Sequence, residues 1–130
     1  MKEVFEFLKK AGVYYVATLD GNQPRVRPFG AIALFEDKIY LQTGKVKEVS
    51  KQIAVNPKAE ISAMAGDKWI RVTAELVSDD RIEAKRYMLE QYPELKGLYS
   101  AEDDNTQVLY LKNVKASINS FTGSPVNYEF

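Results

Sequence analysis

The 130-residue chain carries 18 basic and 18 acidic side chains, so its formal net charge is zero. That balance provides no broad basic surface for nucleic acid or for an anionic membrane. The chain has no cysteine and no histidine, which excludes disulfides, thiolate metal sites, histidine general bases and Ser-His triads. Chemistry near neutral pH would come most easily from a bound cofactor.

The length predicts a single domain, residues 1–130, with one hydrophobic core. No apolar run approaches the roughly 18 residues that span a bilayer. Residues 1–12 also lack the continuous apolar region of a signal peptide. We therefore expect a soluble cytoplasmic protein with no membrane partner and no nucleic-acid partner.

The first part of the chain predicts one helix followed by three strands. Val4, Phe5 and Leu8 form an apolar stripe before Gly12, which is typical of a short amphipathic helix that ends at glycine. Strands are predicted over 13–20, 25–35 and 39–43, with turns at 20–22 and 36–38. Connections this short favour a meander.

The second part predicts two helices and the remaining strands. One helix is expected over 45–55, before Asn56-Pro57, and another over 79–91, where Asp79 or Asp80 would cap the first turn. Strands are expected over 59–65 and 69–77, one or two closing strands within 108–121, and a tail over 123–130. Six or seven strands with three helices predict a mainly β or α+β protein. An antiparallel barrel with peripheral helices buries such strands best, because closure removes the edges.

The segment 21–30 reads GNQPRVRPFG and combines strand alternation with two prolines and two like charges. Arg25 and Arg27 fall on one face of the expected strand, and Pro28 cannot donate to a ladder. Guanidinium groups suit a phosphate or another anion. Charged partners across the strand would explain the same pattern without any ligand.

A second candidate anion site lies within residues 39–52, IYLQTGKVKEVSKQ. The strand ends at Thr43-Gly44, and Lys45, Lys47 and Lys51 then occupy the first two turns of the expected helix. Cations oppose the helix dipole there, whereas the free N–H groups of a helix start bind anions. An anionic ligand would remove this conflict. The alternative is a set of solvated lysines with Thr43 as a simple cap.

Trp69 is the only tryptophan and follows the turn Gly66-Asp67-Lys68. It is either a core residue or a wall on which a planar ring stacks. The same two interpretations apply to four other aromatic residues, for most of which the core is the better one: Tyr14, Tyr15, Phe29 and Tyr40.

The order of these signals resembles the pyridoxamine 5′-phosphate oxidase-like FMN-binding split-barrel proteins, in particular their short stand-alone members. The likeness rests on VATLDGNQPRVRPFG, IYLQTGKVKEVSKQIAVNP, EIS and WIRVTAELV, in this order from about residue 13 to 77, and on the ending SFTGSP. The resemblance implies a six-stranded antiparallel split β-barrel, a homodimer, and FMN held at the dimer interface.

The resemblance also implies site residues. In the family, the arginine-bearing strand contacts the flavin with its backbone and the phosphate with its arginine, a role that falls to Arg27. The strand-end threonine that binds phosphate matches Thr43, and Lys47 or Lys51 replaces a Ser-Arg-Lys segment of the oxidases. No catalytic residue is identified and no metal site is expected. The implied cofactor-binding set is Arg25, Val26, Arg27, Pro28, Phe29, Gln42, Thr43, Lys47, Lys51 and Trp69.

One departure from the family limits the function. The vitamin B6 oxidases bind their substrate partly through a histidine and a C-terminal arginine, but this chain has no histidine and its last arginine is Arg86. We therefore expect an FMN-dependent oxidoreductase that acts on another small molecule, with an electron donor such as NADH or NADPH. The alternatives are a non-catalytic flavin-binding or flavin-sensing module and a barrel that binds another planar anion.

Overall fold

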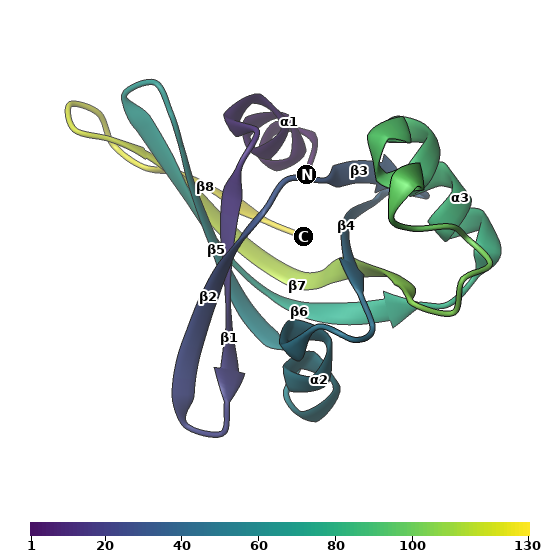
Figure 1. The fold of residues 1–130 in the computed structure, drawn as a ribbon. Coiled ribbons are helices and arrows are strands. Elements are labelled where there is room, and N and C mark those ends of the chain that lie inside the picture. The colour runs from purple at the N-terminus through teal and green to yellow at the C-terminus, as the bar shows by residue number, and fades with distance from the viewer.

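The computed structural model describes residues 1–130 and places eight antiparallel strands in one curved sheet, with helices around it (Figure 1). The mainly β class is confirmed, with eight strands in place of the six or seven predicted. The elements are α1 Lys2–Ala11, β1 Tyr14–Asp20, β2 Gln23–Phe29, β3 Ile32–Phe35, β4 Lys38–Gly44, α2 Glu48–Val55, β5 Lys58–Ala65, β6 Lys68–Asp79, α3 Ile82–Gln91, the 3₁₀ helix η1 Pro93–Gly97, β7 Thr106–Ser120 and β8 Val126–Glu129.

The sheet has the order β2-β1-β5-β6-β7-β4-β3, and β8 pairs with the far half of β7. Its two end strands, β2 and β3, follow each other in the chain with only Gly30 and Ala31 between them, yet no ladder joins them. The sheet is therefore a split barrel, as the resemblance implied, and it keeps two edges that closure of the barrel would have removed. Because β2 is an end strand, Pro24 and Pro28 are tolerated within it.

The single strand predicted over 25–35 is in fact two strands. The chain leaves the ladder of β1 at Phe29 and joins the ladder of β4 at Ile32. Two tyrosine hydroxyls hold this crossover: Tyr14 donates to the Ala31 carbonyl, and Tyr92 contacts both the N–H and the carbonyl of Ile32, at 3.2 and 3.1 Å. Complete burial raises the pKa of Tyr14 well above its ordinary value.

Three further boundaries differ from the sequence prediction. Helix α2 begins at Glu48 instead of Lys45, because the N–H groups of Lys45 and Val46 donate to the carbonyl and side-chain oxygen of Asn105, at 2.7 and 3.1 Å. Helix α3 begins at Ile82, and neither Asp79 nor Asp80 caps it. The expected C-terminal tail over 123–130 contains β8, an added edge strand.

The main core fills the inside of the curved sheet, and two helices close it. Val4 and Leu8 of α1 and Val49 and Ile53 of α2 pack into this core with the inward residues of the strands. Helix α3 covers the other face of β3, β4 and β7, where Met88 and its neighbours pack around Tyr40. No helix combines the length and the apolar character that a membrane crossing requires.

A polar cluster fixes the start of α3 against the β3–β4 hairpin. The Tyr40 hydroxyl donates to Asp79 at 2.7 Å, and the Arg81 guanidinium pairs with Asp79 at 2.9 Å and with Glu36 at 2.6 Å. The hydrogen bonds that Arg81 donates lower the pKa of Asp79 to about 2, whereas burial and the hydrogen bond to the Asp79 carboxylate raise the pKa of Tyr40 to about 12. This cluster orients α3 and therefore the segment that follows it.

Candidate functional site

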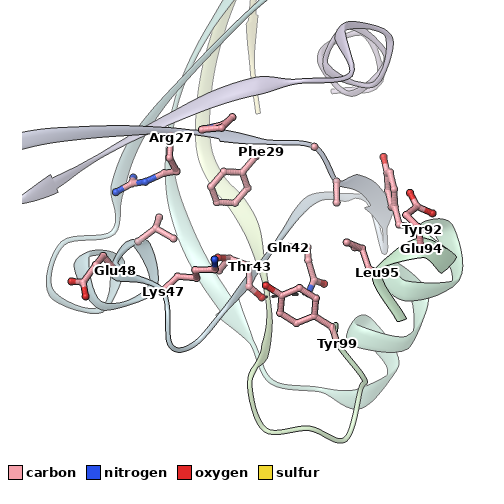
Figure 2. Close-up of a pocket in the computed structure, with 14 residues that line it drawn as sticks. Arg27, Phe29, Gln42, Thr43, Lys47, Glu48, Tyr92, Glu94, Leu95 and Tyr99 are labelled. Atoms are coloured by element: carbon pink, nitrogen blue, oxygen red, sulfur yellow. Dashed lines mark hydrogen bonds between the residues drawn. The ribbon is translucent and has the colours of Figure 1, made fainter. Parts of the chain in front are cut away.

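A cavity of about 600 Å³ opens where the β2–β3 crossover, the end of β4 and the start of α2 face the segment after α3 (Figure 2). Its volume lies within the range of small-molecule binding sites. The crossover contributes residues 27–31, β4 contributes Gln42 and Thr43, the start of α2 contributes 47–49, and the last wall is Tyr92, Glu94, Leu95 and Tyr99.

Arg27 supplies a positive charge to one end of this cavity. Its guanidinium donates to Thr18 Oγ1 at 2.7 Å, to Gln52 Oε1 at 2.8 Å and to the Val16 carbonyl at 3.3 Å. It forms no ion pair with any carboxylate. Burial, together with the nearby charge of Arg25, lowers its pKa from the ordinary value. A half-buried cation that lacks a carboxylate partner suits an anionic ligand.

The start of α2 adds further donors at the same end. Lys47 is the N-cap residue, and the N–H groups of Glu48 and Val49 have no partner within the helix, whereas the Ser50 N–H donates to the Lys47 carbonyl at 3.1 Å. The hydroxyl of Thr43 and the ammonium of Lys47 form no hydrogen bond or ion pair within the protein, and both residues line the cavity. Glu48 also borders it, but its carboxylate is largely exposed, pairs with Lys51 at 3.3 Å and points outward (Figure 2). This end therefore offers mainly donors and positive charge.

The rest of the cavity is aromatic and apolar. Phe29 lies above Thr43 and Gln42, and Tyr99 and Leu95 lie on the side of the segment after α3 (Figure 2). Gln42 is 8% exposed, and its Oε1 has no hydrogen-bond partner, while its Nε2 donates to the Thr43 carbonyl at 3.3 Å. An unpaired buried carbonyl costs about 1–3 kcal/mol, so a ligand that brings an N–H or O–H donor to Gln42 would remove a penalty.

The structure gathers six of the ten predicted cofactor-binding residues around this cavity. They come from the two segments that the sequence singled out, which meet because β3 pairs with β4 and places the crossover beside the end of β4. The six lining residues are Arg27, Pro28, Phe29, Gln42, Thr43 and Lys47.

The other four predicted residues lie outside the cavity. Arg25 is exposed and pairs with Asp20 at 3.4 Å. Val26 is 67% exposed, because strand alternation turns it to the opposite face from Arg27. Lys51 lies one turn into α2 and pairs with Glu48, and Trp69 packs against Phe121 at a ring-centroid distance of 4.9 Å.

Several lining residues were missed by the sequence analysis. Leu95 and Tyr99 belong to the segment 93–107, whose polar, turn-rich composition predicts only a loop, and Tyr92 directly precedes this segment. One feature could have identified Thr18 and Gln52, the two residues that hold Arg27: each is a polar residue at a buried position. Thr18 is a polar residue at a buried position of an alternating strand, and Gln52 is a buried polar residue beside the core position Ile53.

The family of this chain follows from its sequence match over almost its full length. The sequence model described as pyridoxamine 5'-phosphate oxidase matches residues 1–118. This chain belongs to the pyridoxamine 5'-phosphate oxidase family. The resemblance to this family drawn from the sequence motifs is thereby confirmed. No curated protein matches the sequence.

Solved structures of similar proteins support the same assignment. A NimC/NimA family protein from Clostridium acetobutylicum is 45% identical over 100% of this chain and 92% of its own, with a TM-score of 0.97. A pyridoxamine 5'-phosphate oxidase-related, FMN binding protein from Nostoc punctiforme is 16% identical over 99% of this chain and 93% of its own, with a TM-score of 0.72. General Stress Protein 26 from Bacillus anthracis is 13% identical over 98% and 97%, with a TM-score of 0.75. The last two share the fold of this family member.

Proposed function

We propose that this chain binds FMN in the cavity and acts as an oxidoreductase on a small molecule. The observation that carries the proposal is the two-part character of the cavity, with free donors at one end and aromatic and apolar walls beyond them. FMN has the same two parts, a phosphate dianion and a planar ring. The FMN-binding name of the Nostoc punctiforme protein, which has this fold, supports the proposal.

The residues present fit FMN by the chemistry of their free groups. Arg27, Thr43 and Lys47 would hold the phosphate, since each has donors that no protein acceptor uses. Phe29 would lie against the ring and exclude water, and Gln42 would accept from a ring N–H group. Bound FMN would supply the hydride or electron transfer that the side chains of this protein do not provide.

The substrate in this proposal is not pyridoxamine phosphate. Arg86, the last arginine of the chain, lies on α3 and pairs with Glu102 at 2.8 Å, and it does not line the cavity. No histidine is present to replace it. The chain therefore lacks the cationic and histidine groups that the resemblance assigns to a vitamin B6 phosphate site.

Purification of the full chain, followed by mass spectrometry of the co-purified ligand, tests this function. We expect FMN, a flavin absorbance spectrum, and reduction of the flavin by NADH or NADPH followed by turnover of an electron acceptor. A flavin that is neither reduced nor reoxidised by any donor and acceptor pair would support a non-catalytic flavin-binding module instead. A protein that takes up no FMN when the nucleotide is added would contradict the proposal altogether.

The proposed assembly is a homodimer with FMN at the interface, formed through the outer face of β2, β1, β5 and β6. This face exposes a set of large apolar side chains that a monomer would leave in water: Tyr15 at 50%, Val26 at 67% and Met64 at 60% exposure. The set lies on the side of β2 opposite Arg27, so an interface there would adjoin the strand that lines the cavity. Exposed apolar faces of this kind are typical of association sites.

Light scattering tests the dimer directly. We expect about twice the chain mass of 14.8 kDa for the FMN-loaded protein. Val26→Glu should shift the protein toward the monomer, because it buries a charge in the interface. Val55→Glu, a substitution at an 89% exposed residue of α2, is the matched control and should leave the mass unchanged. A wild-type monomer of 14.8 kDa that retains FMN would rule the dimer out.

A further inference from the structure

Two buried polar side chains outside the cavity hold Arg27 from two other elements. Thr18 of β1 is 3% exposed and Gln52 of α2 is 8% exposed, and neither lines the cavity. Thr18 donates its hydroxyl to Gln52 Oε1 at 2.6 Å, and Arg27 donates to both oxygens, at 2.7 and 2.8 Å. The three side chains form a closed triangle that ties β1, β2 and α2 together.

The hydrogen bonds of this triangle leave one edge of the Arg27 guanidinium free. A guanidinium has five N–H donors. Nη1 donates to Thr18 and to the Val16 carbonyl, and Nη2 donates once, to Gln52. The N–H of Nε and the second hydrogen of Nη2 remain, and these two point in parallel from the same edge of the planar group. Such an edge matches two oxygens of one phosphate.

All three acceptors around Arg27 are neutral, whereas three of the other four arginines of this chain pair with a carboxylate and the fourth, Arg71, is exposed and forms no ion pair. Arg25, Arg81 and Arg86 each pair with a carboxylate, at 3.4, 2.6 and 2.8 Å. A carboxylate beside Arg27 would occupy the guanidinium and cancel its charge. The neutral hydroxyl and amide fix the orientation of the side chain and leave its positive charge uncompensated at the cavity.

We infer that Thr18 and Gln52 are positioning residues for phosphate recognition: they hold Arg27 so that its free edge takes two oxygens of the terminal phosphate of the ligand. The inference rests on the proposed function, since it takes FMN as the ligand. Neither residue contacts the ligand. Their contribution is to keep the orientation of Arg27 fixed while leaving it without a competing anion.

The decisive variant is Gln52→Glu, which replaces the neutral amide with a carboxylate of almost the same shape. It should pair with Arg27 and reduce the affinity for FMN by about tenfold or more, while the affinity for riboflavin, which has no phosphate, changes by less than about twofold. Fluorescence titrations of the full chain with both flavins measure this. Asn22→Asp adds the same charge at an exposed turn and should leave both affinities unchanged.

A second pair of variants separates orientation from charge. Thr18→Val removes the hydroxyl from the triangle and should weaken FMN binding about threefold or more, whereas Thr18→Ser keeps the hydroxyl and should restore it. A general loss of stability would weaken riboflavin binding as well. Selective loss of FMN binding in Thr18→Val therefore supports the positioning role even if Gln52→Glu folds poorly.

The outcomes distinguish this inference from the proposed function. Wild-type protein that binds riboflavin as tightly as FMN would contradict the phosphate site itself. A wild-type preference for FMN that survives unchanged in Gln52→Glu and in Thr18→Val would leave the proposed function standing and overturn the positioning role. Equal losses of FMN binding in Thr18→Val and Thr18→Ser would also overturn it, because the hydroxyl would then not matter.

Discussion

Replacement of Arg27 by alanine is expected to weaken FMN binding by about 2–4 kcal/mol, the order of a lost charge-assisted, two-bond contact. The variant removes the one cavity cation that the structure holds in a fixed orientation by three hydrogen bonds. It also leaves Thr18 and Gln52 bonded to each other, so the local fold retains a partner for each. Calorimetric titration with FMN at a fixed salt concentration measures the change.

The matched control is Arg25→Ala, which removes the same charge two residues earlier on the same strand. Arg25 is exposed and its pair with Asp20 is long, at 3.4 Å, so its loss should change FMN binding by less than about 0.5 kcal/mol. A loss confined to Arg25→Ala would show that the wrong arginine was assigned to the phosphate. No loss in either variant would mean that the charge alternation of β2 serves the fold alone.

The sequence predicts the strands well wherever one face of a strand is buried. In β1 and β5, buried and exposed residues alternate, so the period-two pattern of Val16 or Ile61 and their neighbours is visible in the sequence. The break between β2 and β3 has no such signal, because the residues on both sides of it, from Phe29 to Leu34, form one run without polar side chains. Strand β2 ends at Phe29 because its partner β1 begins at Tyr14, directly opposite, and offers no residue for further pairing.

The candidate site is predictable only where its residues share a short segment. Arg27, Phe29 and Thr43 belong to local patterns, and pairing of β3 with β4 brings those patterns together. The opposite wall depends on long-range contacts that hold the segment after α3. Tyr92 is fixed by the backbone of Ile32, and the Asp103 carboxylate accepts the N–H groups of Asn105 and Thr106, which lowers its pKa.

The choice between the two arginines shows why register matters more than pattern. Alternation places Arg25 and Arg27 on the same face of β2, so it cannot show which of the two is available to bind an anion. The ladder sets Arg27 opposite Val16 and lets it reach the neutral Thr18 and Gln52. Arg25, nearer the turn, meets the carboxylate of Asp20. Only the three-dimensional neighbours decide which guanidinium stays available for an anion.

Phe29→Ala is expected to have the largest effect on stability, about 3–5 kcal/mol of the free energy of unfolding. The ring is 9% exposed and packs in the main core, with its centroid 5.9 Å from that of Tyr14. It also forms a wall of the cavity, so its loss leaves a void that joins the core to the site. Urea unfolding of the ligand-free protein, followed by fluorescence, measures the change.

The control for this prediction is Phe29→Leu, which keeps an apolar side chain in the core and should lower the free energy of unfolding by less than half as much.

Added FMN separates the two roles of Phe29, in the core and at the cavity. A ligand that binds only the folded state raises its stability in proportion to the logarithm of its concentration over the dissociation constant. If Phe29 also lies against the ring, saturating FMN should stabilise both variants less than the wild type. An equal gain in stability from FMN in all three proteins would place the flavin ring away from Phe29. A urea-unfolding midpoint of ligand-free Phe29→Ala equal to that of the wild type would contradict the place of Phe29 in the core.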